Sequence, residues 1–492
     1  MVNDFIYKTP EEEGLSSEKI VEFIQTAAER KINLHSVMIV RNGNILTEAY
    51  YKPFDENFMH RLYSCSKTFV SIAIGMLIDE GKLRLDDKIV DLLPEFVHRE
   101  QGEFMRECTV EDALKMSVPM LTDTYGFEIK DWVGSFFNRV PDLKPSGTIF
   151  NYNTSGSFIL DVIVEKITGK PFLEYMRPVL DKIGVSKDIW CVQSPDGYSW
   201  GGSGVVATTR DFAKFGELIL NKGNYKGEQL ISKEYMEKAT SMQISNYLEN
   251  ANYTYRSSGY GYQIWMHPHG YLLSGMGSQM VYCYPEKNFM FVCTADTQCS
   301  ADFAPQTLYY MVTDILYKNL CDGALPNNKA SNERLQALIK DLNTNIPFGE
   351  KNSPNEKNFD GVKYELADNP MGWKWFRFDF DKDGGTLSYE NARGEKKLYF
   401  KRNEQVDQAF PETNDYAEQV ATPAGRGLRC LVSGSWLEEN KFQVRTHFID
   451  INMGSSFMTF GFKGDKVGLF ISTRAEFFMR DYLGYAAGKK VN

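Results

Sequence analysis

The chain has 492 residues, which is enough for two or three domains that each bury a core of their own. Apolar residues make up 42% and charged residues 24%, an ordinary globular composition that excludes fibrous proteins, small disulfide frameworks and wholesale disorder. The formal net charge of −10 has the wrong sign for binding phosphate backbones, so we expect no nucleic-acid partner.

The N-terminal segment lacks the basic flank, apolar core and small-residue cleavage site of a secretion signal. The longest nearly apolar run, residues 69–78, is far shorter than the roughly 18 residues needed to span a bilayer. The eight cysteines are scattered, with no Cys-x-x-Cys pair and no zinc-type spacing beside the histidines. These features predict a cytoplasmic protein with free thiols, without a membrane partner, a metal or another cofactor.

Helix and strand signals in the first two thirds of the chain predict an α+β unit. An amphipathic helix is expected over 16–30, followed by a hairpin whose strands, 36–40 and 45–51, flank the turn dipeptide Asn42-Gly43. We expect an antiparallel sheet built from both ends of this region, flanked by helices and interrupted by a helical insertion. The remaining candidates are helices at 64–80, 110–115, 155–167, 172–179, 209–220 and 305–320, and strands at 259–265, 271–273, 279–284 and 289–294.

The rest of the chain predicts a second, β-rich domain. The turn-rich segment 321–332 is the best linker candidate, and a helix is expected over 333–342. Short β-rich runs separated by turn signals then predict a C-terminal antiparallel β-barrel or sandwich domain. These runs are 373–380, 387–389, 398–401, 428–433, 442–451, 456–462 and 467–472. The expected organisation is therefore a domain over 1–325, a linker and helix over 326–347, and a β domain over 348–492.

The most informative motif is Ser64-Cys65-Ser66-Lys67, at the start of a strongly helical apolar run. Positions three apart lie on one face of a helix, so Lys67 comes next to the hydroxyl of Ser64. A neighbouring base activates a serine, and a lysine acts as that base when burial or nearby positive charge lowers its pKa. The helix start favours the anion that forms, because its free N–H groups and its dipole end are positive.

Further stretches occur in a fixed order around this motif. They are YSCSKTF from Tyr63, GKLRLDDKIVDLLPEF from Gly81, PSGTIFNYNTSGSFILDVIVEKITGK from Pro145, GGSGVVATTRDFAKFGELILNKG from Gly201 and SGMGSQMVYCYPEKN from Ser274. Over about 10–320 the chain thereby resembles the serine β-lactamase and penicillin-recognising superfamily. The resemblance is to the branch of class C β-lactamases, D-alanyl-D-alanine peptidases, related esterases and 6-aminohexanoate-dimer hydrolase, which implies a β-lactamase/transpeptidase-like fold. The C-terminal part more loosely resembles lipocalin-like β domains.

The resemblance also implies a set of site residues. Ser64 matches the nucleophile that forms the acyl-enzyme, Lys67 its proton acceptor, and Tyr152 the second-motif tyrosine that passes a proton to the leaving group. The backbone N–H groups of Ser64 and Met276 correspond to the oxyanion hole. The positions implied to bind substrate are Asn153, Thr154, Ser274 and Gly275.

Two positions depart from the family pattern. Class C β-lactamases carry asparagine two places after the tyrosine, whereas this chain has Asn153 one place after it. The third motif has Leu273 where β-lactamases and peptidases place a cation or imidazole that holds the substrate's carboxylate. The missing charge favours a small, less charged ester or amide as substrate. A D-aminopeptidase, a true β-lactamase, and a sensor or binding protein with slow or no turnover stay as alternatives.

The segment from Asp379 to Glu390 satisfies a twelve-residue calcium-loop pattern, with oxygen ligands at positions one, three, five and twelve and glycine at six. A true calcium loop joins two helices, but here the strand-like run WKWFRF precedes it and another strand follows. The dipeptide Asp383-Gly384 is typical of a hairpin turn. We therefore expect a hairpin rather than a metal site.

Overall fold

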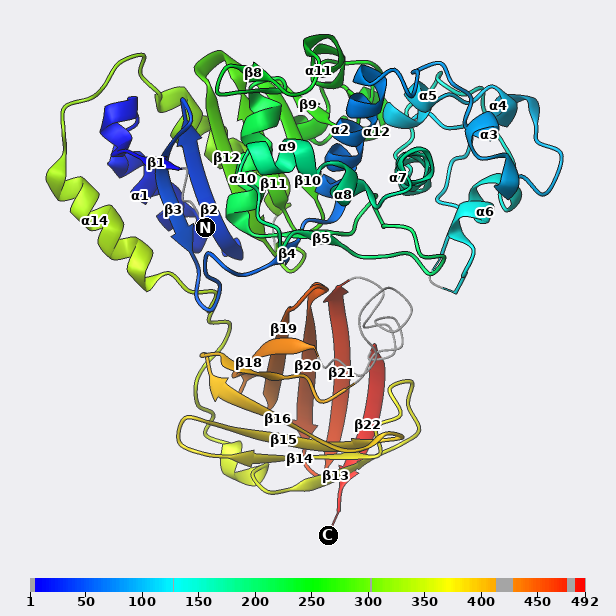
Figure 1. Cartoon of the computed structure of the whole chain (residues 1–492). Coiled ribbons are helices and arrows are strands. Elements are labelled where there is room, and N and C mark those ends of the chain that lie inside the picture. The colour runs from blue at the N-terminus through cyan, green and yellow to red at the C-terminus, as the bar shows by residue number, and fades with distance from the viewer. Residues whose placement is uncertain (1–4, 127, 301–302, 413–427, 476–482, 492) are drawn as a thin grey trace. The chain divides into compact units, whose positions relative to one another are not determined.

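The computed structural model describes residues 5–126, 128–300, 303–412, 428–475 and 483–491, and Figure 1 shows its helices and strands. The chain divides into two compact units, Met1–Asn343 and Thr344–Asn492. Within the described ranges, no helix is both long and apolar enough to cross a membrane.

A seven-stranded sheet, counted within the described residues, organises the first unit in the order β1-β3-β2-β12-β11-β10-β9. Neighbouring strands are antiparallel, except for the parallel pair β1 and β3. Three strands come from the start of the unit and four from its end, which confirms the α+β prediction (Figure 1). Their bounds are Ile6–Tyr7 (β1), Leu34–Arg41 (β2), Asn44–Tyr50 (β3), Trp265–His267 (β9), Gly270–Gly275 (β10), Gln279–Tyr284 (β11) and Phe289–Ala295 (β12).

The predicted hairpin joins β2 to β3. Asn42 and Gly43 have φ angles of 52° and 75°, the left-handed conformation that a tight two-residue turn requires. The turn pairs Arg41 with Asn44 and Val40 with Ile45, and a bulge beyond them shifts the register so that Ile39 pairs with Thr47. Successive side chains of a strand point to opposite faces of the sheet. The sheet therefore has two faces, and a layer of helices covers each of them.

One layer contains α1 (Ser17–Glu29), whose apolar positions are buried and whose Phe23 ring lies 5.1 Å from that of Phe291. The other layer contains α10 (Thr209–Leu220), where Gly216 lies against Met290 and Val281. Because Phe291 and Met290 are consecutive residues of β12, the two helices cover opposite faces of the sheet. The first layer also holds α13 (Ala304–Met311), a π-turn (Val312–Leu316) and α14 (Lys329–Asp341).

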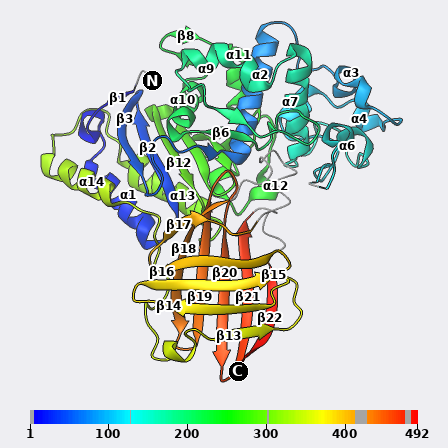
Figure 2. The same cartoon turned by 60° about the horizontal axis from the view of Figure 1, so that its bottom comes forward.

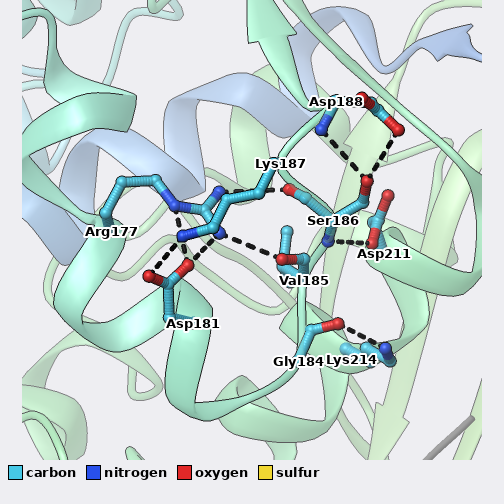
Figure 3. A network of polar contacts seen from close by, with 9 residues as sticks. All are labelled: Arg177, Asp181, Gly184, Val185, Ser186, Lys187, Asp188, Asp211 and Lys214. Carbon is cyan, nitrogen blue, oxygen red and sulfur yellow. Dashed lines mark hydrogen bonds and ion pairs between the residues drawn. The ribbon is translucent and has the colours of Figure 1, made fainter. Parts of the chain in front are cut away.

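The helical insertion lies between β3 and β9, and its central helices α2 and α7 pack on each other. The link from α9 to α10 is held by a polar network, drawn in Figure 3, in which Arg177 donates to Asp181 and to the Val185 and Ser186 carbonyls. Asp211 accepts the Ser186 N–H at 2.7 Å. The helices are α2 (Ser66–Asp79), α3 (Ile89–Leu92), α4 (Glu103–Arg106), α5 (Val110–Leu114), α6 (Trp132–Asn138), α7 (Thr154–Thr168), α8 (Phe172–Tyr175), α9 (Arg177–Lys182), α11 (Lys233–Ala239) and α12 (Tyr247–Asn250). Short strands are β4 (His60–Arg61), β5 (Trp190–Cys191), β6 (Val205–Ala207), β7 (Asn224–Tyr225) and β8 (Glu228–Gln229).

Some predicted elements differ from the structure. The strand expected over 259–265 is not formed, because Gly259 and Gln263 have positive φ angles that break the extended backbone, and only Trp265 belongs to β9. The segment expected to be a linker, 321–332, is tied into the first unit. Its Cys321 N–H donates to the Gly14 carbonyl, and α14 packs on α1.

The second unit is a β-barrel. Among its described residues, nine strands form a closed ring in the order β16-β15-β14-β13-β22-β21-β20-β19-β18, because β16 also pairs with β18. The short strand β17 pairs with β18 next to this contact, along residues 429–432. Figure 2 shows β14–β16 crossing in front of β19–β21. The strands are β13 (Lys363–Leu366), β14 (Trp375–Phe380), β15 (Gly384–Asn391), β16 (Gly394–Arg402), β17 (Val406–Ala409), β18 (Arg429–Glu438), β19 (Lys441–Ile449), β20 (Met453–Lys463), β21 (Lys466–Ala475) and β22 (Gly484–Lys490).

Aromatic side chains fill much of the barrel's core. Phe378 contacts Phe400, Phe442 and Phe460, with ring centroids 4.8–6.0 Å apart, and all four rings are buried. Edge-to-face contacts of this kind add to the stabilisation that burial provides. These four aromatic side chains therefore form part of the packed core of the barrel.

The segment with the calcium-loop pattern forms the hairpin between β14 and β15. Asp381 accepts the N–H groups of Asp383 and Gly384 at 2.8 and 2.7 Å, which closes the turn. Glu390 lies opposite Trp375 at the other end of the hairpin, where it pairs with Lys374. Within the described part of the chain, no group of three His, Cys, Asp or Glu residues is arranged to hold a metal ion.

Candidate active site

Ser64 lies in a single 3-10 turn, Tyr63–Cys65, that runs directly into α2. Tyr63 has a φ of 49°, a strained angle for a residue with a side chain. Ser66 holds this backbone in place, since its hydroxyl donates to the Tyr63 carbonyl at 2.6 Å and accepts the Val205 N–H at 2.9 Å. The turn leaves Ser64 only half-buried, while the residues on either side of it are buried.

Lys67 stands one helical turn after Ser64 with its ammonium group in the protein interior. Its Nζ lies 3.1 Å from the Oγ of Ser64 and 2.6 Å from the carbonyl oxygen of Gly202, and the residue is 1% exposed. Burial lowers the pKa of Lys67 from 10.5 to about 7, and Arg61 acts in the same direction, whereas the charge of Asp123 opposes it. A lysine with this pKa is partly unprotonated near neutral pH and is able to accept a proton.

Tyr152 directly precedes the N-cap of α7, and it lines the same pocket as Ser64, with which its phenol interacts. Lys67 Nζ lies 5.0 Å from the centroid of the Tyr152 ring, and Trp265 stacks on that ring at 5.2 Å. Burial raises the pKa of Tyr152, although its interaction with Ser64 and the charge of Arg256 lower it in part. The phenol is therefore protonated at rest and is poised to donate.

Strand β10 forms the wall opposite the nucleophile. A Cβ at Gly275 would lie 2.3 Å from the carbonyl oxygen of Leu62, so only glycine lets β10 pass this close to the segment before Ser64. Met276 follows as the first residue after the strand. A pocket of about 290 Å³ lies here, lined by Ser64, Tyr152, Tyr255, Arg256, Trp265, Ser274, Gly275, Met276, Gly277, Ser278, Met280, Phe303 and Pro305.

Comparison with family models matches residues 22–312 to the family described as Beta-lactamase, which is more than half of the chain. The chain belongs to the Beta-lactamase family. This is a family of serine hydrolases of the β-lactamase and penicillin-binding-protein type, and the match contains every residue that lines the pocket.

Individual relatives are distant. The chain is 24% identical over 221 residues to the 6-aminohexanoate-dimer hydrolase of Paenarthrobacter ureafaciens, a match over 41% of this chain and 55% of that protein. The chain thus spans about half the length of this curated relative. Among solved structures, a putative 6-aminohexanoate-dimer hydrolase from Bacillus anthracis is 20% identical with a TM-score of 0.50, covering 63% of this chain and 86% of that one. A putative beta-lactamase from Bacteroides dorei is 17% identical with a TM-score of 0.51, covering 61% and 99%. These likenesses show the fold.

The structure brings most of the residues inferred from the family resemblance to one place. Ser64, Tyr152, Ser274, Gly275 and Met276 line the pocket, and Lys67 lies behind Ser64.

Asn153 and Thr154, which we expected to bind substrate, occupy other positions. The side chain of Asn153 is fully buried and caps α7, accepting the Gly156 N–H and donating to the Thr122 carbonyl, both at 2.9 Å. The backbone N–H of Thr154 donates to Asp123 at 2.6 Å, and its side chain lies beside Gly202. Both residues therefore position the start of α7 and with it Tyr152, because an N-cap fixes the first turn of a helix.

Sequence reasoning missed two features of this site. The carbonyl of Gly202, from the stretch GGSG, holds Lys67, but a backbone acceptor leaves no signature in a side-chain pattern. Arg256 comes from a 3-10 turn, Thr254–Arg256, and brings a cation to the pocket. Arg256 lies between the predicted helices and strands, in a stretch that has neither helical nor strand periodicity. The sequence therefore gave no signal for its place in the pocket.

Proposed function

We propose that this protein is a serine hydrolase that cleaves an ester or amide bond of a small molecule through an acyl-enzyme on Ser64. The observation that carries the proposal is the contact of one hydroxyl with two proton-transfer groups. Ser64 is hydrogen-bonded to Lys67 and interacts with the phenol of Tyr152, and it opens into a pocket of about 290 Å³. A nucleophile within hydrogen-bond reach of its base is the arrangement that covalent catalysis requires.

In the acylation step, the neutral amine of Lys67 takes the proton of the Ser64 hydroxyl while Oγ attacks the substrate's carbonyl carbon. The negative charge that forms on the carbonyl oxygen is stabilised by the backbone N–H groups of Ser64 and Met276. The bond to the leaving group then breaks, and the leaving group takes the phenolic proton of Tyr152. The Lys67 ammonium returns a proton to the Tyr152 phenolate, which restores both groups.

In the deacylation step, water attacks the Ser64 ester. The same two groups act in reverse order, so that one proton of the water reaches Ser64 Oγ and the acid product leaves. The raised pKa of Tyr152 supports its assignment as the proton donor, because a neutral phenol has a proton to give. The lowered pKa of Lys67 supports its assignment as the base.

The substrate class follows from the pocket's size and lining. Its volume suits a small acyl or leaving group, and Tyr255, Trp265 and Phe303 give it aromatic walls. Leu273, at the third-motif position, is 1% exposed and is absent from the lining of the pocket. A panel of acyl esters, D-amino-acid amides, ω-amino-acid oligomers and a chromogenic cephalosporin covers the candidate activities, including that named for the Paenarthrobacter relative.

The test combines turnover with covalent labelling. We expect the wild-type protein to hydrolyse p-nitrophenyl butyrate and to be labelled stoichiometrically at Ser64 by a fluorophosphonate. We expect Ser64→Ala to lose both the hydrolysis and the labelling, while an unchanged circular dichroism spectrum shows that the fold is intact. The matched control is Cys65→Ala, since this thiol is buried and donates to the Gln279 carbonyl. Retained turnover in Ser64→Ala overturns the proposal. Labelling of wild type without turnover of any panel member favours the sensor or binding protein instead.

A further inference from the structure

We propose that Arg61 is a positioning residue for the reaction, which holds the Gly202 carbonyl against Lys67 and keeps a fixed positive charge near this base. The inference rests on the proposed function, in which Lys67 takes the proton of Ser64. Arg61 belongs to β4, three residues before the nucleophile, and is not one of the residues that line the pocket. It therefore acts through Lys67 and not on the substrate.

Arg61 connects two segments of the site. Its backbone pairs with β6, the strand that follows the turn at residues 200–204. Its side chain donates from Nε to the Ser203 carbonyl at 2.8 Å and from Nη2 to the Ser203 hydroxyl at 3.1 Å. One residue therefore ties the strand that leads to Ser64 to the turn that holds Lys67.

The anchoring of Ser203 restrains the Gly202 carbonyl. This carbonyl belongs to the same planar peptide unit as the Ser203 N–H, which donates to the Trp200 carbonyl at 2.9 Å. The turn is also tightly packed, because a Cβ at Gly202 would lie 2.7 Å from the Thr154 side chain. Fixing Ser203 therefore fixes the direction of the oxygen that accepts from Lys67 at 2.6 Å.

Two aromatic rings hold the guanidinium itself. Its central carbon lies 4.5 Å from the ring centroid of Tyr63 and 4.6 Å from that of Trp200, and Arg61 is 1% exposed. Such contacts stabilise a cation that has been removed from water. An arginine does not lose its proton in proteins, so this charge stays in place while Lys67 titrates.

The charge of Arg61 favours the neutral amine of Lys67. Arg61 lowers the pKa of Lys67, in addition to the larger effect of burial. Asp123, from the loop before α6, and Cys65, on the nucleophile's own turn, act in the opposite direction. The ring of Tyr152, 5.0 Å from Nζ, also favours the ammonium form. Without Arg61, these groups would leave more of the lysine protonated at neutral pH.

The other titratable groups around the turn do not offset this charge when they are neutral. Asp161 and Glu165, from α7, accept backbone N–H groups of residues 201 and 199, both at 3.1 Å. Burial raises the pKa of both carboxyls and of the Cys191 thiol of β5, which favours their neutral forms. Burial lowers the pKa of His60, beside Arg61 on β4, to about 3, so this imidazole carries no charge near neutral pH.

The test measures how fast a fluorophosphonate labels Ser64 at different pH values, a reaction that needs the nucleophile and its base but no turnover. The rate of wild type should rise with pH and reach a plateau, with an inflection near pH 7. Arg61→Gln keeps an amide donor for Ser203 but loses the charge. We expect its inflection to move to higher pH by about half a unit or more, and its plateau to fall about 3- to 10-fold. The exposed control Arg84→Gln, which makes the same change in net charge, should leave both unchanged.

Two further variants separate the charge from the anchor. Ser203→Ala removes the hydroxyl that accepts from Nη2 but keeps the charge, so its plateau should fall about threefold while its inflection does not rise. Asp123→Asn removes a charge of the opposite sign. In the double variant Arg61→Gln/Asp123→Asn, the inflection should therefore return toward that of wild type, a compensation that a merely structural defect would not show.

The inference is wrong if the inflection of Arg61→Gln stays in place or moves to lower pH, or if Ser203→Ala has the plateau of wild type. If Arg61→Gln does not fold, the plateau of Ser203→Ala alone decides. Wild type that is labelled at Ser64 but shows neither effect in the variants leaves the proposed function standing without a role for Arg61. Wild type that is not labelled at Ser64 contradicts the proposed function, and this inference with it.

Discussion

Lys67 Nζ lies 3.1 Å from Ser64 Oγ in a site where the lysine is 1% exposed. Because burial lowers the pKa of Lys67 to about 7, the fraction of neutral amine rises as the pH increases through that value. We predict that kcat/KM for a neutral ester rises about tenfold per pH unit below pH 7 and reaches a plateau above it. A profile that is flat between pH 5.5 and 8.5 contradicts the assignment of Lys67 as the base.

Asp123 modulates the same equilibrium. Its charge raises the pKa of Lys67, and its carboxylate accepts the N–H groups of Thr154 and Ser155 at 2.6 and 3.1 Å. We predict that Asp123→Asn, which keeps an acceptor for these groups, shifts the acidic limb of the pH profile to lower pH. The exposed control Asp86→Asn, whose partner is Arg84, should leave the limb in place. A shift to higher pH in Asp123→Asn would count against the electrostatic role of Asp123.

Asp161 holds in place the segment that binds Lys67. It is fully buried, accepts the Gly201 N–H at 3.1 Å and so holds the segment whose Gly202 carbonyl binds Lys67. Burial, with a smaller effect of Glu165, raises the pKa of Asp161 well above its ordinary value, so the folded state keeps a proton that the unfolded state releases. That contribution to stability is present at low pH and is lost as the pH rises.

We therefore predict that the free energy of unfolding of Asp161→Asn, relative to that of wild type, increases from about pH 4 to pH 7. Urea titrations at several pH values measure this trend. A destabilisation by the amide that is the same at every pH does not change the trend. Asp161→Leu removes the acceptor of the Gly201 N–H and should lose about 1–3 kcal/mol at every pH. A difference between Asp161→Asn and wild type that does not change with pH contradicts a protonated Asp161.

A substitution of Gly275 tests whether β10 must lie this close to the turn that carries Ser64. In Gly275→Ala, the new Cβ would meet the Leu62 carbonyl at 2.3 Å, so the turn that carries Ser64 must shift. We predict a loss of about 1–3 kcal/mol in stability and a much larger fractional loss of kcat/KM. The control is Gly468→Ala in the barrel, where a Cβ would have no neighbour within 4 Å. Activity equal to that of wild type in Gly275→Ala would show that the contact is not required.

The parts of the fold that follow from local signals were predictable. The helical period of α1 and the Asn42-Gly43 turn each depend on a few adjacent residues, and the structure confirms both. The break at Gly259 and Gln263 was not predictable, because their positive φ angles depend on tertiary contacts that the β-rich composition of the segment conceals. The ring closes where β16 pairs with β18, and these strands are separated by β17 and a long stretch of chain. Local sequence signals therefore did not decide between a barrel and a sandwich.

The residues of the candidate site were likewise predictable only in part. The Ser64 and Lys67 pair follows from helical spacing, and Tyr152 from a resemblance between motifs. Asn153 was assigned to substrate on that resemblance, yet its side chain caps a helix, a role that asparagine often has at the first position before a helix. Arg256 lies outside every motif and is brought to the pocket by tertiary packing against Trp265, so no local pattern identifies it.

The most direct test of the account is the mass of the enzyme during turnover. Wild type mixed with p-nitrophenyl butyrate and quenched in acid should carry one butyryl group, and peptide mapping should place it on Ser64. Ser64→Ala treated in the same way should carry none and release no nitrophenol above the uncatalysed rate. Turnover without an acyl-enzyme on Ser64, with the butyryl group on another residue or on none, would contradict the central claim.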